Sequence, residues 1–243
     1  MELNYEQLGS GVFVQISSAH GFGTDAVLLA DFANPKRNDK IFDLGTGCGI
    51  IPMLFFRDNK GASITGVELQ RQGYLQAVES VKKSNAGKTV TIINHDLREL
   101  NSVLTHGSAD VVTMNPPYKA PNTGIISSEK SAEIARHETE CTLEDICKCA
   151  SHLLNFGGKL CLCNRPERLC DTITAMKNNN IEPKRLRFVV KNAESKPWLF
   201  LIEGKKGSKP FLDVKNSLIM YDGNGELSQE VLKIYGKYKE GQA

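Results

Sequence analysis

The sequence predicts a doubly wound α/β fold around a mostly parallel sheet. From about residue 40, short β-rich runs alternate with longer helical patterns. Repeated strand-then-helix order implies right-handed crossovers and a parallel sheet that is covered by helices. A length of 243 residues, with 40% hydrophobic and 24% charged residues, suits one large globular domain or one domain with an appendage.

The elements of the core follow from local residue patterns. Strands are expected at residues 40–44, 63–68, 89–94, 109–114 and 158–164. Helices are expected at residues 49–57, 70–83, 97–104, 129–137, 143–154 and 166–178. Residues 185–191 and 197–203 predict two further strands that form an antiparallel hairpin. Such a terminal hairpin is compatible with the edge of a mixed sheet.

Two segments lie outside this core. The first contains a predicted strand at residues 12–16 and a short helix at residues 25–33, and the second ends in an amphipathic helix near residues 228–238. We therefore expect three parts, namely an N-terminal segment (1–38), a core (39–204) and a C-terminal extension packed on the core (205–243).

The charge balance limits the classes of partner. The chain has 30 Lys and Arg against 28 Asp and Glu, which gives a net charge of +2. This near balance argues against a protein that binds nucleic acid through its overall charge. Net charge does not describe how charge is distributed, so a local basic patch remains compatible with it.

Cysteine usage and hydropathy point to a cytoplasmic protein without membrane contact. Seven cysteines, an odd number, do not suit a secreted disulfide framework. The C-x-C pairs Cys147/Cys149 and Cys161/Cys163 lack the spacing of a zinc site, so no metal is expected. The N-terminus lacks the pattern of a signal peptide. The apolar run at residues 50–56 is far shorter than the ~20 residues that span a bilayer.

The first chemical motif is DLGTGCG at residues 43–49, directly after the first core strand. Its glycines let the backbone turn sharply at the carboxyl end of the strand, where ligands bind in open α/β sheets. The spacing differs from a dinucleotide motif, and the acidic residue before the glycines suits a ligand with an ammonium group better than a pyrophosphate. The alternative is a tight turn without a ligand. The candidate ligand-binding residues are Asp43, Gly45, Thr46, Gly47 and Gly49.

Two acidic residues end the next two strands. Glu68 closes the second strand, and its carboxylate could hold two ribose hydroxyls or could be a solvated strand-end acid. Asp96 follows the third strand, where it could bind an adenine amino group or act as a helix N-cap. Both alternatives for Asp96 remain open from the sequence.

The fourth strand ends in Asn115-Pro116-Pro117-Tyr118. The prolines stiffen the chain and hold the preceding residue extended. This rigidity would fix the Asn115 carboxamide and the Pro116 carbonyl as a pair of acceptors, with the ring of Tyr118 as a stacking face. Such a site fits a planar amine. The alternative is an ordinary turn.

These motifs together resemble the class I S-adenosylmethionine-dependent methyltransferases that carry an N-P-P-Y amine-methylating motif. The run GFGTDAVLL at residues 21–29 is similar to the cofactor-wall segment of one subgroup. The resemblance extends to residues 115–120, 136–138 and 201–211. From about residue 8 to residue 238, the chain is similar to the bacterial tRNA(Val) adenine-37 N6-methyltransferases.

The resemblance implies S-adenosylmethionine as cofactor and a seven-stranded Rossmann-like sheet whose N-terminal segment covers the cofactor site. It also implies cofactor contacts from Thr24, Asp25, Leu69, Leu97 and Asn115. The same N-P-P-Y motif serves guanine N2 in ribosomal RNA and glutamine in release factors, so the motif alone does not select adenine. A non-enzymatic alternative is a cofactor-binding module that interacts with RNA.

A tRNA partner would contact basic residues. Residues 184–209 contain eight Lys and Arg against two Glu, on strands expected at the sheet edge. Residues 119–138 predict a lid over the target base, or else an insertion without a role. The candidate RNA contacts are Lys119, Lys130, Arg136, Lys191, Lys205 and Lys206. A monomer is favoured.

Overall fold

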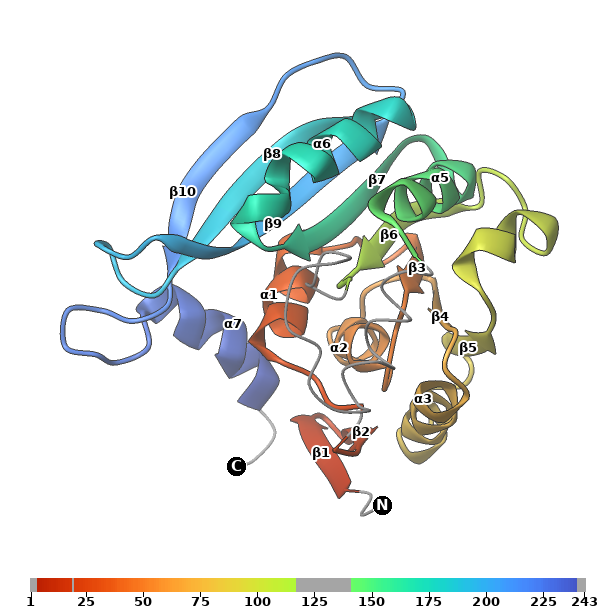
Figure 1. Ribbon diagram of the computed structural model, residues 1–243. Coiled ribbons are helices and arrows are strands. Elements are labelled where there is room, and N and C mark those ends of the chain that lie inside the picture. Colours follow the sequence, from red (N-terminus) through yellow and green to blue (C-terminus); the bar gives the residue numbers. More distant parts are fainter. Residues whose placement is uncertain (1–3, 19, 117–140, 240–243) are drawn as a thin grey trace, which may run out of the picture.

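The computed structural model describes residues 4–18, 20–116 and 141–239. Its centre is an eight-stranded sheet (Figure 1). In spatial order the strands are β10 (Asp213–Ile219), β8 (Ile181–Val190), β9 (Pro197–Lys206), β7 (Leu154–Asn164), β6 (Ala109–Met114), β3 (Lys40–Leu44), β4 (Ser63–Glu68) and β5 (Val90–Asn94). All neighbouring pairs are parallel except β7–β9 and β8–β9. The predicted doubly wound, mostly parallel sheet with an antiparallel hairpin is confirmed.

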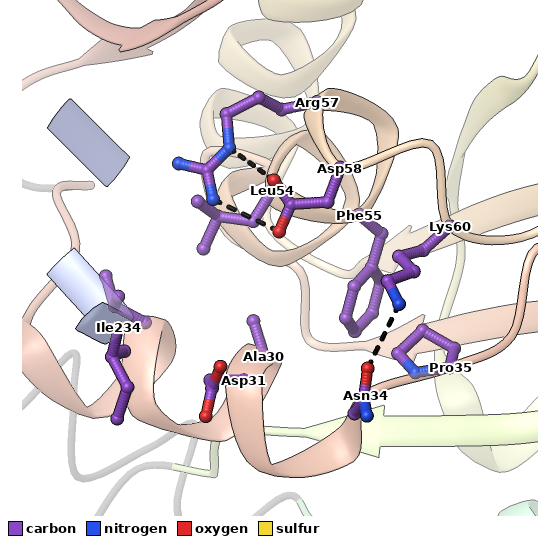
Figure 2. Close-up of a pocket in the computed structure, with 11 residues that line it drawn as sticks. Ala30, Asp31, Asn34, Pro35, Leu54, Phe55, Arg57, Asp58, Lys60 and Ile234 are labelled. Carbon is purple, nitrogen blue, oxygen red and sulfur yellow. Dashed lines mark hydrogen bonds and ion pairs between the residues drawn. The ribbon is translucent and has the colours of Figure 1, made fainter. Parts of the chain in front are cut away.

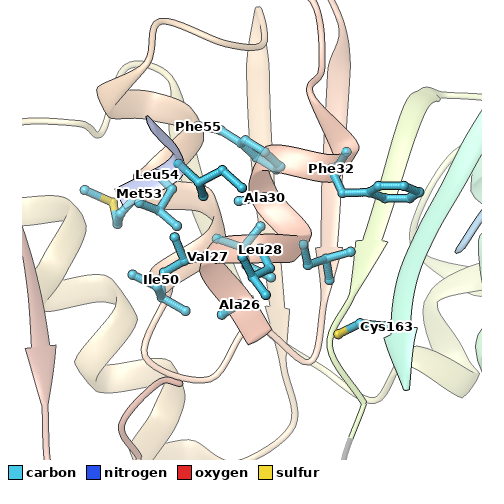
Figure 3. Close-up of a cluster of buried hydrophobic side chains, with 14 of the residues drawn as sticks. Ala26, Val27, Leu28, Ala30, Phe32, Ile50, Met53, Leu54, Phe55 and Cys163 are labelled. Carbon is cyan, nitrogen blue, oxygen red and sulfur yellow. The ribbon is translucent and has the colours of Figure 1, made fainter. Parts of the chain in front are cut away.

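Helices cover both faces of the sheet. They are α1 (Thr24–Ala33), α2 (Ile50–Arg57), α3 (Arg71–Lys83), α5 (Leu143–Leu153), α6 (Leu169–Asn178) and α7 (Gln229–Lys239), with short 3-10 helices η1 (Leu97–Ser102) and η2 (Pro166–Arg168). Alternate strand residues point to opposite faces, so the core divides into two clusters. One cluster packs under α1, α2 and α7 (Figure 3), and the other under α5, α6 and η1. Cys161 and Cys163 both lie in the first cluster, as their spacing predicts.

The N-terminal residues form an antiparallel hairpin outside the main sheet. It consists of β1 (Asn4–Gly9), which the sequence reading missed, and the predicted strand β2 (Val12–Ile16). The hairpin packs on α3 through backbone N–H groups of Phe13 and Gln15, which donate to the hydroxyls of Ser84 (2.8 Å) and Ser80 (2.9 Å). These bonds fix the segment that leads into α1.

The C-terminal side of the sheet differs from the prediction. A strand that the sequence reading missed, β10, pairs in parallel with β8, so the sheet has eight strands and β8 is not an edge strand. The strand is mostly exposed and polar, which hides the hydrophobic alternation typical of a strand. The predicted 166–178 helix is divided into η2 and α6, and β7 begins at Leu154, four residues before its predicted start at residue 158. The helix expected at residues 129–137 lies outside the described residues.

In the described part of the chain, no helix has the length and apolar character that crossing a bilayer requires. The same residues contain no group of three or more His, Cys, Asp or Glu side chains arranged to hold a metal ion. None of the seven cysteines, all of which are described, forms a disulfide.

Candidate active site

The turn after β3 brings the chain close to the ends of two neighbouring strands. Gly45, Gly47 and Gly49 all adopt positive φ angles, of 62°, 57° and 86°. A Cβ on Gly49 would lie 3.1 Å from the Cβ of Ala77 in α3, so the residue allows close packing of the turn on that helix. A Cβ on Gly47 would meet nothing within 4 Å. The Gly47 backbone therefore faces open space and is accessible to a ligand.

Glu68 binds the glycine turn from the end of β4. Its Oε2 accepts from the N–H of Gly47 at 2.7 Å, and its Oε1 accepts from the N–H of Gln70 at 2.7 Å. The residue is only 6% exposed. Each carboxylate oxygen has more than one acceptor site, so both oxygens can also accept a hydroxyl of a ligand.

Two cavities of about 400 Å³ each meet at the carboxyl ends of β3, β4 and β6. One lies beside Glu68, Leu69, Asp96, Leu97 and Pro116, and the other under the glycine turn. The residues common to both linings are Asp25, Gly45, Gly47 and Asn115. Residues predicted from separate motifs thus surround one continuous region.

Two predicted cofactor residues line neither cavity. Gly49 packs against α3, and the Oγ1 of Thr24 accepts a hydrogen bond of 2.8 Å from the hydroxyl of Tyr235 in α7. Thr24 therefore links the start of α1 to the C-terminal helix, while its neighbour Asp25 faces the cavities.

Asp43 lines the cavity under the glycine turn, yet it is only 1% exposed. Its Oδ1 accepts a hydrogen bond of 2.6 Å from the Thr113 hydroxyl. Burial raises the pKa of this carboxyl to about 7, although the hydroxyls of Thr113 and Thr46 oppose the rise. A cation bound nearby would favour its ionised form.

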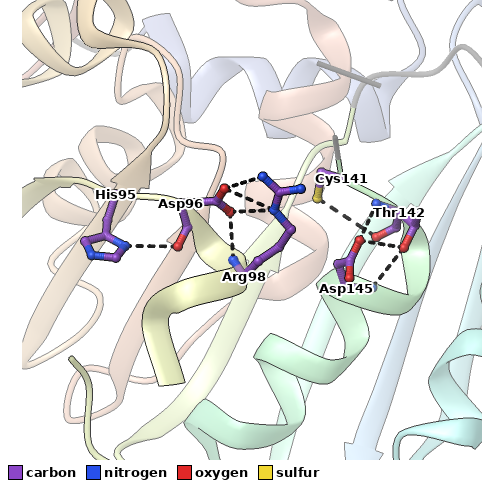
Figure 4. Close-up of polar contacts among 6 residues, drawn as sticks. All are labelled: His95, Asp96, Arg98, Cys141, Thr142 and Asp145. Carbon is purple, nitrogen blue, oxygen red and sulfur yellow. Dashed lines mark hydrogen bonds and ion pairs between the residues drawn. The ribbon is translucent and has the colours of Figure 1, made fainter. Parts of the chain in front are cut away.

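Asp96 is the N-cap of η1 and forms an ion pair with Arg98 (Figure 4). Its carboxylate accepts from the backbone N–H of Arg98 at 2.9 Å and from the Arg98 guanidinium. These bonds hold the pKa of Asp96 below its ordinary value. The N-cap interpretation is confirmed, and because Asp96 also lines the cavity, a ligand-binding role stays a prediction.

Asn115 and Pro116 stand directly after β6. The Asn115 Nδ2 donates to Asp25 Oδ2 at 3.1 Å, and Pro116 is buried. Tyr118, Lys119, Lys130, Arg136 and the predicted lid at 119–138 lie outside the described residues. The part of the clamp that the structure describes therefore consists of Asn115 and Pro116.

Several residues at the site were missed by sequence reasoning. His20 Nε2 and Gln70 Oε1 are 2.8 Å apart at the cavity wall, which Arg98 and Cys141 also line. Cys163 approaches Asn115 from β7. Among these, Arg98 could have been found, because a basic side chain two residues after an N-cap Asp can pair with it.

The basic candidates do not form one surface. Lys191 follows the carboxyl end of β8, on the side of the sheet where β6 and β7 also end, although β9 and β7 separate β8 from β6. Lys205 and Lys206 lie on the opposite side of the sheet, at the end of β9. There, Lys205 pairs with Lys159 near the start of β7. Lys206 donates to the carbonyl of Leu154 at 2.8 Å, and its burial lowers its pKa. The structure therefore separates Lys205 and Lys206 from Lys191, and the RNA contacts stay predictions.

A third hollow lies away from the glycine turn, between α1, α2 and α7 (Figure 2). Its volume is about 30 Å³, which has room for about one water molecule. Lys60 Nζ donates to Asn34 Oδ1 across it at 3.1 Å. Its size excludes a cofactor.

Solved structures share the fold of this chain. A crystal structure described as a predicted O-methyltransferase from Agrobacterium tumefaciens matches with a TM-score of 0.72 at 21% identity, covering 89% of this chain and 98% of that one. The fold is therefore that of a methyltransferase. More particularly, the chain belongs to the methyltransferase small domain family, whose model matches residues 9–190.

Curated relatives share a narrower name. A tRNA1(Val) (adenine(37)-N6)-methyltransferase from Histophilus somni is 34% identical over 139 residues. A protein of the same name from Bacteroides fragilis is 27% identical over 136 residues. The alignments cover 57% and 56% of this chain, and 58% and 56% of those relatives. The matched region thus spans somewhat more than half of each relative.

Proposed function

We propose that the protein transfers a methyl group from S-adenosylmethionine to the N6 atom of an adenine in tRNA. The observation that carries this proposal is the position of Asn115, which lines both cavities where they meet. A cofactor that extends through both cavities would reach this side chain where they meet, and so would a target amine held by Asn115 and Pro116. The particular target, adenine 37 of tRNA(Val), is suggested by the names of the curated relatives.

The residues of the two cavities fit this cofactor. Glu68 can accept ribose hydroxyls, and Leu69 and Leu97 provide apolar surface for an adenine ring. The exposed backbone of Gly47 allows close approach. Asp43 and Asp25 add acidic groups that suit the cationic methionine portion. The bound cofactor would supply an electrophilic methyl group on its sulfonium.

The protein must make the target amine nucleophilic, because the N6 lone pair of adenine is delocalised into the ring. The Asn115 carboxamide oxygen and the Pro116 carbonyl would accept the two N6 hydrogens. This arrangement draws the nitrogen toward tetrahedral geometry and localises its lone pair. Catalysis is then mainly positioning and electrostatic stabilisation, without an obligatory general base. The target base would have to leave the stacked RNA, and Tyr118 would then stack on this base.

A tRNA substrate would bind through its phosphates to cations near the site. Lys191 is exposed and lies on the side of the sheet where β6 ends. Lys119, Lys130 and Arg136 follow Asn115 and Pro116 in the sequence. We place the binding surface there and not at Lys205 and Lys206. A protein that modifies tRNA in this way would act in the cytoplasm. The proposal requires no metal and no membrane.

The test is methyl transfer from labelled S-adenosylmethionine to bulk tRNA, ribosomal RNA and release factor, assayed in parallel. We expect label in tRNA, and mass mapping of the product should find N6-methyladenine. Label only in ribosomal RNA would indicate that the methyl acceptor is guanine. Label only in release factor would indicate that it is glutamine. Cofactor binding with no transfer to any of the three would support the non-enzymatic RNA-binding module instead.

A further inference from the structure

The carboxamide of Asn115 is held by two side chains from other elements. Its Nδ2 donates to Asp25 Oδ2 at 3.1 Å, and its Oδ1 accepts from the Sγ of Cys163 at 3.1 Å. Asp25 lies in the first turn of α1, and Cys163 is a fully buried residue near the end of β7. Residues 90 and 48 positions away in the sequence thus converge on one amide. Figure 3 shows Cys163 on its strand beside the cluster under α1.

Both contacts select the same orientation of the carboxamide. A carboxylate only accepts hydrogen bonds, so Asp25 requires the nitrogen of Asn115. A thiol is a donor, so Cys163 favours the oxygen. A carboxamide rotated by a half-turn would place its oxygen against the Asp25 carboxylate, with two acceptors facing each other. A carboxamide oxygen has two acceptor sites, so an oxygen that accepts from a thiol can also accept an N–H of a substrate.

We propose that Cys163 is a positioning residue for the target amine. Together with Asp25, it holds the Asn115 carboxamide so that the oxygen, and not the NH₂ group, is available to the amine. This inference rests on the proposed function for the acceptor role of Asn115. The orientation itself belongs to the free protein, so it can be measured separately from methyl transfer.

The chain offers a closely matched control. Cys161 lies on the same strand and the same face as Cys163, and both are fully buried. The Cys161 thiol lies 4.0 Å from Glu203 Oε2. Cys161→Ala and Cys163→Ala remove the same atoms from the same buried face of one strand, but only Cys163→Ala removes the thiol that donates to Asn115. Cys163→Ser keeps a donor of similar size.

The first experiment observes the carboxamide directly. In protein labelled with ¹⁵N at asparagine, the side-chain amide signal of Asn115 is assigned by its loss in Asn115→Asp. We expect Cys163→Ala to shift this signal, Cys163→Ser to restore most of its wild-type position, and Cys161→Ala to leave it unchanged. An unchanged signal in Cys163→Ala would overturn the proposal, and so would an equal shift in Cys161→Ala.

The second experiment measures single-turnover methyl transfer to tRNA. Losing one hydrogen bond that orients the acceptor should lower the rate of Cys163→Ala roughly 3- to 10-fold, with partial rescue in Cys163→Ser. The KM for tRNA and the affinity for S-adenosylhomocysteine should stay at wild-type values. A parallel loss of S-adenosylhomocysteine affinity would indicate a merely structural role. If the wild type methylates none of the acceptors, the proposed function fails, while the amide signal still decides the orientation.

Discussion

The side chain of Asn115 carries the proposed chemistry, and its removal gives the most direct test. Asn115→Ala deletes one of the two acceptors for the amine while leaving Glu68 and the glycine turn in place. We expect the turnover number to fall roughly 10²- to 10³-fold, as for the loss of one preorganised polar group at a reacting centre. S-adenosylhomocysteine affinity, measured by calorimetry, should be retained. Unchanged single-turnover rates would contradict the acceptor role.

Asp43 gives a prediction about pH. Its pKa is about 7 in the folded protein against the ordinary 3.8, so between these values the folded state binds more protons than the unfolded state. The contribution of Asp43 to stability is therefore present in full below pH 4 and lost as pH rises through about 7. Asp43→Asn removes this dependence, since the amide is neutral and its oxygen can still accept from Thr113.

The measurement for Asp43 is thermal unfolding of both proteins from pH 4 to pH 8. The difference in Tm, variant minus wild type, should become more positive as pH rises to about 7 and then level off. A change of at least ~2 °C is expected, which is on the order of 1 kcal/mol for a domain of this size. A difference that is constant with pH would show that Asp43 is ionised throughout.

At the level of the elements, the start of α5 has a complete capping box (Figure 4). The Thr142 hydroxyl accepts from the N–H of Asp145 at 3.1 Å, and Asp145 Oδ2 accepts from the N–H of Thr142 at 2.9 Å. Thr142→Ala should lower the free energy of unfolding by about 1 kcal/mol in urea titrations. Thr142→Ser should retain the cap, and a Ser variant as unstable as the Ala variant would contradict this account.

The elements also show what the sequence could predict. Residues 40–44, 63–68 and 109–114 were assigned correctly because buried parallel strands are apolar runs bounded by turns. The strand β10 escaped because it is exposed and polar, and its place depends on pairing with β8. Local pattern contains no information about such a partner. Arg187 and Glu230, 2.7 Å apart, likewise join β8 to α7 by a contact that no short motif announces.

The position of the cavities was predictable from residues that directly follow or end a parallel strand. Gly45, Gly47 and Glu68 line the predicted region because the carboxyl ends of adjacent parallel strands must meet. Cys163 was not predictable as a partner of Asn115, since that contact depends on the register between β6 and β7. Motifs therefore identified groups that line the cavities, while the contact between Cys163 and Asn115 required the assembled sheet.

At the scale of the whole molecule, the fold places the basic residues of segment 184–209 on two opposite sides of the sheet, at the two ends of its strands. Two arginines of residues 184–209 are already paired, Arg185 with Glu203 at 2.8 Å and Arg187 with Glu230 at 2.7 Å. The remaining lysines are separated because β8 and β9 run in opposite directions. The turn after β8 carries exposed Lys191 and Lys196, on the side of the sheet where β6 and β7 end.

This division predicts different effects for two double variants that each remove two positive charges. Lys191→Ala/Lys196→Ala changes the side of the sheet where β6 and β7 end, and Lys205→Ala/Lys209→Ala changes the opposite side. Lys206 is left intact because it binds the Leu154 carbonyl. If tRNA docks over the site, the first variant should lower affinity and reduce the slope of log K against log salt by about 1 to 2. The second should keep wild-type affinity and slope in binding titrations from low to moderate salt. Equal losses in both variants would mean that tRNA contacts both edges of the sheet, and a loss only in the second would place the tRNA on the edge away from Asn115.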